Sequence, residues 1–217
     1  MEESSFYLLG FKFMELGNFI TDIIMAIASY TFYIKLKNDK DNLYFSYFFL
    51  FMAISSFLGG FGHLLYNYTE KPFQIFGWFF SSLSVYFIEY AAIKELKSKK
   101  IKKRLNILIN IQFLLFTISA LTFQEFIVVT ISTIVGLMGI VIPILGIQAF
   151  HKNKKRNILI ISGILLSGIP AFLYKLNGDI IGLSGKELSH LILVLCFYII
   201  FIGVNTSTVK EKAVNSL

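Results

Sequence analysis

The sequence predicts an all-α membrane protein, a single bundle of seven transmembrane helices with the N-terminus outside and the C-terminus in the cytoplasm. Hydrophobic residues make up 56% of its 217 residues. Charged residues make up 15%, whereas a soluble domain carries about 25%. These charges are clustered, and the seven apolar runs between the clusters approach the roughly 20 residues that cross a bilayer. The basic residues, moreover, gather in alternate loops.

The seven apolar runs belong to one domain, 1–217, and each is expected to be a helix. Lipid offers no partners to backbone groups, so a span must be a helix or a strand of a closed barrel. Barrel strands alternate in polarity, whereas these runs are long and continuously apolar. Pro143 and Pro170 lie inside the fifth and sixth runs and should kink them. The runs cover residues 15–35, 43–66, 72–94, 105–123, 126–150, 157–175 and 189–206.

The basic residues between the runs set the expected orientation. Three follow the first run, seven the third and four the fifth, and two lie in the tail, whereas the other side has four. Under the positive-inside rule the richer side is cytoplasmic. The net charge of +7 is therefore an orientation signal, and we expect membrane lipids as partners and no nucleic acid. The Lys-, Ile-, Phe- and Asn-rich composition is typical of an AT-rich bacterial genome, so the expected location is the bacterial inner membrane.

Three polar residues of the first run share one helix face. Glu15, Asn18 and Asp22 follow an i, i+3, i+7 spacing, and Asp22 lies about two turns into the helix. An ionisable side chain in a spanning helix is costly, so it marks a functional site by default. The structural alternative is that Asp22 hydrogen-bonds inside the bundle and helps to specify how the helices pack.

Two histidines are predicted to lie near the same, outer end of the bundle. His63 ends the second run after a glycine-rich stretch, and His190 begins the last run, three residues after Glu187. The third histidine, His151, lies in an inner loop about 30 Å away. Glu89, near the inner end of the third run, should snorkel to the inner surface or pair with Lys94 or another inner-loop lysine. The candidate ligand-binding residues are thus Glu15, Asn18, Asp22, His63, His190 and Trp78, the single tryptophan, near the outer third of the third run.

Two functions fit this cluster. The residues could form a polar pocket in the outer leaflet that binds a lipid or small lipid-like ligand, in a sensing or binding role. Alternatively, His63, His190 and Asp22 could hold zinc, since two histidines, a carboxylate and an open position form a catalytic zinc site. The protein would then be a zinc-dependent amide or ester hydrolase acting on a lipid. Two histidines that only hydrogen-bond to their neighbours are the structural alternative to a metal site.

The pattern resembles the seven-helix superfamily of alkaline ceramidases and adiponectin-type receptors. The shared features are the topology, the stretch Glu15-Leu16-Gly17-Asn18-Phe19-Ile20-Thr21-Asp22, and the histidines at positions 63 and 190. In the ceramidases, the corresponding Glu and Asn belong to a cation-binding segment. The helix 2 histidine and two helix 7 histidines there hold a catalytic zinc, beside a serine and an aspartate. The resemblance therefore implies a lipid-facing site and, if complete, zinc-dependent hydrolysis.

The chain departs from the ceramidase pattern at three positions. Gly59 stands where the family has a serine, Gln74 lies near the family aspartate, and Lys186 stands where the first helix 7 histidine would be. The chain looks closer to uncharacterised bacterial seven-helix relatives that keep the Thr-Asp pair, a helix 3 tryptophan and one helix 7 histidine. Because a full zinc set is missing, the sequence favours the ligand-binding interpretation over a degenerate zinc hydrolase.

Overall fold

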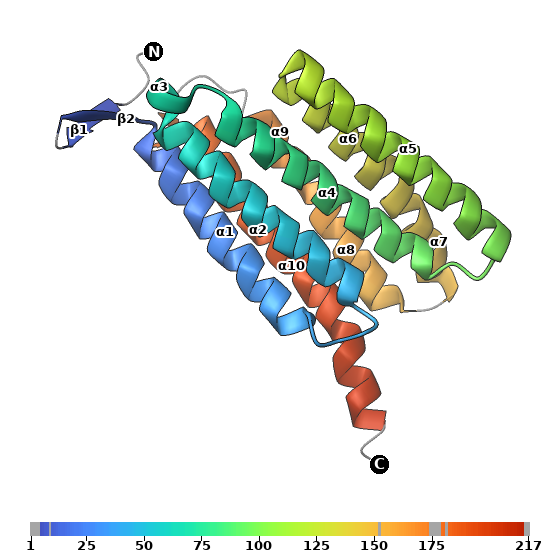
Figure 1. The fold of residues 1–217 in the computed structure, drawn as a ribbon. Helices are drawn as coiled ribbons and strands as arrows, with labels where there is room; N and C mark the ends of the chain where they lie inside the picture. The colour runs from blue at the N-terminus through green and yellow to red at the C-terminus, as the bar shows by residue number, and fades with distance from the viewer. Residues whose placement is uncertain (1–4, 9, 152, 174–178, 181, 215–217) are drawn as a thin grey trace.

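Seven helices in the described part of the chain are long and apolar enough to cross a membrane, which confirms the predicted helical class. The computed structural model describes residues 5–8, 10–151, 153–173, 179–180 and 182–214, with side chains to residue 206. The helices run side by side in one bundle (Figure 1). They are α1 (Leu16–Leu36), α2 (Leu43–Leu64), α4 (Pro72–Lys94), α5 (Lys99–Phe123), α6 with a π-helical turn η1 and α7 (Phe126–Gly136, Leu137–Val141, Ile142–His151), α8 with α9 (Lys154–Leu166, Gly168–Leu173) and α10 (Gly185–Val214).

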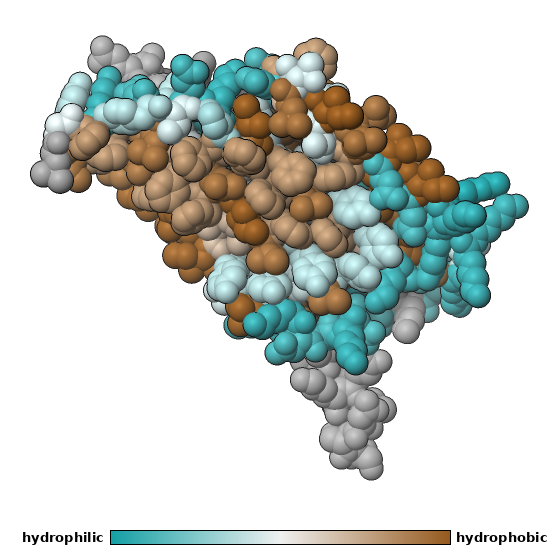
Figure 2. Space-filling view, in the orientation of Figure 1, coloured by the Kyte–Doolittle hydropathy of each residue, from teal (hydrophilic) through white to brown (hydrophobic). Residues whose placement is uncertain are grey.

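The bundle has two hydrophilic ends and a hydrophobic belt between them (Figure 2). The hairpin end carries the antiparallel strands β1 (Ser5–Leu8) and β2 (Phe11–Met14), the short helix α3 (Tyr66–Thr69) and the strand pair β3 (Asp179–Ile180) and β4 (Leu183–Ser184). The basic end carries the starts of α5 and α8, with the basic residues 99–104 and 154–156. The hydropathy pattern predicted none of the short elements.

Two helices begin earlier than predicted because polar residues cap them. α5 begins at Lys99 rather than 105, where the hydroxyl of Ser98 accepts a hydrogen bond from the N–H of Ile101 (3.4 Å). α10 begins at Gly185 rather than 189, at a capping box. The hydroxyl of Ser184 accepts the N–H of Glu187 (3.2 Å), and Oε2 of Glu187 accepts the N–H of Ser184 (2.6 Å). Hydropathy marks where a segment becomes apolar, not where its helix starts.

Both proline-containing spans are irregular where the prolines require it. A proline lacks an N–H, and its ring meets the carbonyl of the residue four positions earlier. For Pro143 that residue is Gly139, inside the π-helical turn. For Pro170 it is Leu166, the last residue of α8, after which Ser167 separates α8 from α9. The expected irregularity at both prolines is confirmed.

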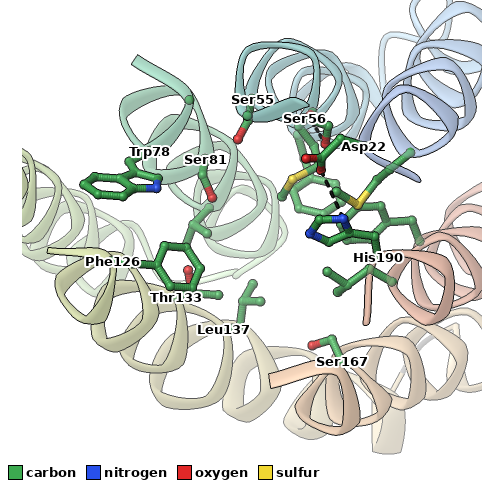
Figure 3. Close-up of a pocket in the computed structure, with 18 of the residues that line it drawn as sticks. Asp22, Ser55, Ser56, Trp78, Ser81, Phe126, Thr133, Leu137, Ser167 and His190 are labelled. Carbon is green, nitrogen blue, oxygen red and sulfur yellow. Dashed lines mark hydrogen bonds and ion pairs between the residues drawn. The ribbon is translucent and has the colours of Figure 1, made fainter. Parts of the chain in front are cut away.

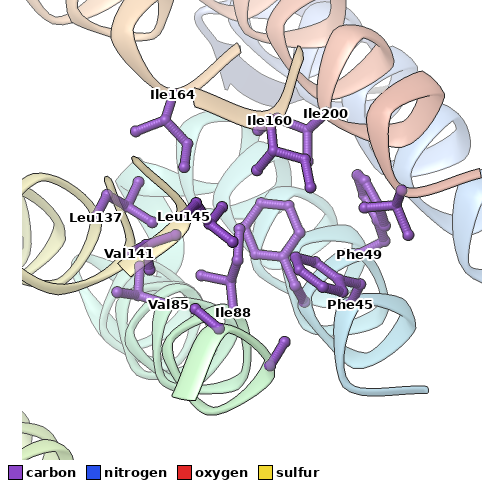
Figure 4. Packing of buried hydrophobic residues seen from close by; sticks show 14 of the residues in the cluster. Phe45, Phe49, Val85, Ile88, Leu137, Val141, Leu145, Ile160, Ile164 and Ile200 are labelled. Atoms are coloured by element: carbon purple, nitrogen blue, oxygen red, sulfur yellow. The ribbon is translucent and has the colours of Figure 1, made fainter. Parts of the chain in front are cut away.

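The apolar core fills the half of the bundle nearer the basic end. It combines aromatic rings of α1, α2 and α10 with aliphatic side chains of α4, α7 and α8 (Figure 4). Phe32 stacks on Phe201 with ring centroids 4.7 Å apart, and Phe49 meets Phe32 edge-on. Burial and dispersion contacts make this half tightly packed. The polar residues of the hairpin end therefore lie at the opposite end of the bundle from most of the apolar core.

Glu89 does not reach a lysine, so that sequence-based expectation is wrong. Its side chain is 1% exposed and accepts a hydrogen bond from Nε2 of Gln112 in α5 (2.8 Å). It packs against Gly136, where an added Cβ would lie 2.4 Å from Oε1 of Glu89. Sequence position could not reveal this, because the helix face that carries Glu89 turns toward α5 and α6 rather than toward the basic loops.

Candidate functional site

Glu15 joins three helices at the hairpin end. It precedes α1 with a left-handed backbone (φ 44°), and its side chain is 12% exposed. Oε1 accepts a hydrogen bond from Nζ of Lys186 on α10 (2.6 Å), and Oε2 pairs with Nδ1 of His63 on α2. Asn18 donates to the same Oε2 (2.9 Å). Burial alone would raise the pKa of Glu15, but the hydrogen bonds from His63 and Lys186 outweigh it and lower the pKa to about 2.

Asp22 lies between the two histidines, as the sequence pattern predicted. Its side chain is buried, with Oδ2 4.0 Å from Nε2 of His63 and Oδ1 3.5 Å from Nδ1 of His190. The two imidazole rings are 6.3 Å apart between centroids. A Cβ at Gly60 would lie 3.1 Å from the Cβ of Asp22, so this close approach of α1 and α2 depends on a glycine.

The hydroxyl of Thr21 holds the imidazole ring of His190 in place. Its hydroxyl donates to the carbonyl of Gly17 or Asn18, at 3.1 and 3.0 Å. Nδ1 of His190 lies 3.0 Å from the same hydroxyl oxygen. When the hydroxyl proton is on a carbonyl, the neutral imidazole donates from Nδ1 to Thr21 and Nε2 is the acceptor. Nε2 points into the cavity described next (Figure 3).

A cavity of about 270 Å³ opens beside this cluster, between α1, α2, α4, α6, α8 and α10. Four of the six predicted ligand-binding residues line it: Asp22, His63, Trp78 and His190. Toward the apolar core its wall is made by Phe48, Val85, Ile88, Leu137, Ile164, Phe197 and Ile200. The cavity is therefore polar near the hairpin end and apolar in the middle of the bundle.

Sequence reasoning missed a group of hydroxyl side chains on the cavity wall. Ser55, Ser81, Thr133 and Ser167 come from α2, α4, α6 and the junction of α8 with α9 (Figure 3). Thr133 and Ser167 face the cavity from opposite sides, and Leu137, the first residue of the π-helical turn, lies between them. Both proline-induced irregularities thus border the cavity. Only Ser167, three residues before Pro170, had a signal in the sequence that could have identified it.

Three acidic or amide residues of the predicted cluster do not line the cavity. Glu15 and Asn18 lie behind Asp22 and hold His63, so they support the site rather than form its wall. Glu187 caps α10 and packs on Gly17, where an added Cβ would lie 1.4 Å from its Oε1. His151, as expected, ends α7 at the basic end and is exposed.

The predicted zinc ligands come together but do not fit a zinc ion. Among the described residues, no group of three or more His, Cys, Asp or Glu side chains is arranged to hold a metal. A catalytic zinc site needs three protein ligands that face one point. Here Nε2 of His63 lies 4.0 Å from Oδ2 of Asp22, whereas Nδ1 of His190 lies 3.5 Å from the other oxygen, Oδ1, so the three side chains do not converge on one position.

Purified protein is therefore expected to contain no stoichiometric zinc. The measurement is elemental analysis after incubation with zinc and removal of unbound metal, on the wild type beside His63→Ala. Both proteins should give the same background value, because no three of the described His, Cys, Asp and Glu side chains are arranged to hold a metal. One zinc per wild-type chain, lost in His63→Ala, would contradict this expectation and favour the hydrolase.

Comparison with known proteins assigns the chain to a family, but that family has no known activity. The profile of DUF6962, a family of unknown function, matches residues 18–208. The matched range contains Asp22, His63, Trp78 and His190. No curated protein and no solved structure matches the chain.

Proposed function

We propose that this chain, which belongs to the DUF6962 family of unknown function, binds a lipid or another small amphiphilic ligand in the cavity, in a sensing or binding role. The observation that carries the proposal is the composition of one cavity wall. Asp22, His63, Trp78 and His190 meet at one end, and aliphatic and aromatic side chains form the other. Such a largely apolar pocket with a few convergent polar groups is the usual form of a ligand site.

The polar end would recognise a head group that donates hydrogen bonds. The carboxylate of Asp22 and Nε2 of His190 are acceptors, and the nearest ring nitrogens lie 3.5 and 4.0 Å from the carboxylate oxygens. The carboxylate therefore has room for a stronger partner than the protein supplies. The volume of 270 Å³ is just below the range of about 300 to 1,000 Å³ typical of ligand pockets. It favours a small or single-chain amphiphile.

A ligand dissolved in the bilayer would enter from the side. Phe126 and Thr133 of α6 lie on one side of the cavity and Ser167 on the other (Figure 3). Phe126 is 44% exposed, and Ile169, just beyond Ser167, is 47% exposed. An opening between α6 and the α8–α9 junction would thus lead from the hydrophobic belt to the hydroxyl-lined wall. The two proline-associated irregularities lie beside this proposed entrance.

The proposal includes the orientation expected from the loop charges. The starts of α5 and α8 carry the basic residues 99–104 and 154–156 at the end of the bundle opposite the cavity's polar cluster. Under the positive-inside rule that basic end is cytoplasmic. The cavity would then lie in the outer half of a bacterial inner membrane. The resemblance to ceramidases and adiponectin-type receptors supports a lipid-related ligand, but the incomplete zinc set favours binding over hydrolysis.

Trp78 offers a direct test because it is the only tryptophan and lines the cavity. The probe is a single-chain fatty alcohol brominated on its chain, titrated into protein in detergent micelles. Bromine quenches tryptophan on contact, so we expect saturable quenching that an excess of unlabelled alcohol reverses. The matched control is Thr122→Trp with Trp78→Phe, because Thr122 is exposed on the lipid-facing side of α5. Quenching of the control should rise without saturation. Identical titration curves for the two proteins would contradict the proposal.

A further inference from the structure

The β1–β2 hairpin has one entirely apolar face. Its register pairs Phe6 with Phe13 and Leu8 with Phe11, and side chains of a strand alternate between faces. These four residues therefore share one face. The opposite face carries Ser5, Tyr7, Lys12 and Met14. One face of the hairpin is therefore uniformly apolar, whereas the other is mixed.

The apolar face is covered near the bundle and open toward the tip. Phe6 and Phe13 stack with ring centroids 5.2 Å apart and are partly buried. Leu8 is 55% exposed and Phe11 is 57% exposed. The hairpin extends sideways from the end of the bundle, away from the helices (Figure 1). An isolated two-stranded hairpin is marginally stable in water, so its open apolar face is expected to pack against another surface.

The hairpin is also held at a defined level along the bundle. The N–H of Lys12 donates to the hydroxyl of Tyr68 on α3 (2.7 Å), and the ring of Phe11 meets that of Tyr68 edge-on. Met14 is buried, and Leu16, two residues later, is already 40% exposed on the hydrophobic belt. In Figure 2 the hydrophobic surface begins directly below the hairpin and continues along the helices. The open apolar face thus borders the surface that faces lipid.

We propose that the hairpin is a membrane-surface anchor whose open apolar face, Leu8 and Phe11, inserts at the boundary between lipid head groups and acyl chains. The continuity with the hydrophobic belt identifies lipid as the occupant. The opposite face, with Lys12 and Tyr7, faces water and head groups, where lysine and tyrosine are stable. Because Met14 is followed directly by Glu15, the anchor also sets the level of the residue that joins α1, α2 and α10. This inference goes beyond ligand binding and does not depend on it.

The test compares the two faces of the hairpin in the full-length protein. Leu8→Trp and Tyr7→Trp are each made with Trp78→Phe, so that the new tryptophan is the only one. The proteins are placed in nanodiscs of phosphatidylcholine brominated at the top of the acyl chains. Quenching of Leu8→Trp should exceed that of Tyr7→Trp by at least twofold, and Phe11→Trp gives the same readout if Leu8→Trp fails to fold.

Two outcomes would overturn the anchor. Equal, weak quenching at both positions, with emission at the long wavelength of tryptophan in water, would place the hairpin outside the bilayer. If the Leu8→Trp tryptophan is shielded from water only in nanodiscs that hold two protein copies, a second chain rather than lipid covers the apolar face. Both outcomes are independent of whether the cavity binds the brominated alcohol, so failure of the anchor and failure of the proposed function are distinguishable.

Discussion

Replacing Glu15 by alanine is expected to lower the free energy of unfolding by about 3 kcal/mol, as for loss of one partner in a buried charge network. Glu15 is the acceptor that joins His63 of α2 and Lys186 of α10 to the start of α1. Its removal takes away the carboxylate that both of these partly buried groups contact. Unfolding in mixed detergent micelles measures the change. Glu125→Ala, at an exposed position of the same end, should change stability by less than about 0.5 kcal/mol.

The contribution of Glu15 should also depend on pH. Its pKa is lowered from 4.5 to about 2 in the folded protein, so the unfolded state binds the proton more readily. The stabilisation is therefore complete above pH 4.5 and is lost as the pH falls toward 2. A shift of this size corresponds to about 3 kcal/mol. The wild type should lose more stability than Glu15→Gln between pH 5 and 2. Parallel curves for the two proteins would show that Glu15 is not held as a carboxylate by His63 and Lys186.

The sequence predicted the helices and the meeting of the polar residues because both follow from strong local patterns. Long apolar runs locate the spans within a few residues. Asp22 lies near the start of α1, His63 at the end of α2 and His190 near the start of α10, and in an alternating bundle these positions meet at one end. Pro143 and Pro170 specify the irregular turns. The inside-outside assignment is still a prediction from loop charge.

The remaining features depend on contacts between segments distant in sequence. The rotation of each helix about its axis decides which neighbours its side chains contact. For this reason Glu89 contacts Gln112 rather than a lysine, and Glu187 caps the start of α10 rather than lining the cavity. Thr133 and Ser167 line the same cavity beside Leu137, which the separate apolar runs did not reveal. The hairpin was missed because four-residue strands carry too weak a pattern beside apolar runs of 20 residues. The sequence likewise could not show how the ring of His190 is turned toward Asp22, and this orientation decides whether the predicted zinc ligands converge.

Filling the cavity should abolish ligand retention. Ser81→Phe places a ring on the cavity wall between the polar cluster and the apolar wall, where a bound chain would pass. The matched control, Thr122→Phe, adds the same ring on the exposed side of α5. Overpacking of the wall could cost about 1 to 3 kcal/mol of stability, so the unfolding transition of each variant is measured alongside. Comparison is made only between folded proteins.

The measurement that tests the central claim most directly is mass spectrometry of the intact protein released from its native membrane in a mild detergent. The account predicts one non-covalently bound amphiphile per chain in the wild type and in Thr122→Phe, and none in Ser81→Phe. An unliganded wild type, or the same bound amphiphile in Ser81→Phe as in the wild type, would contradict the claim that this cavity is a ligand-binding site.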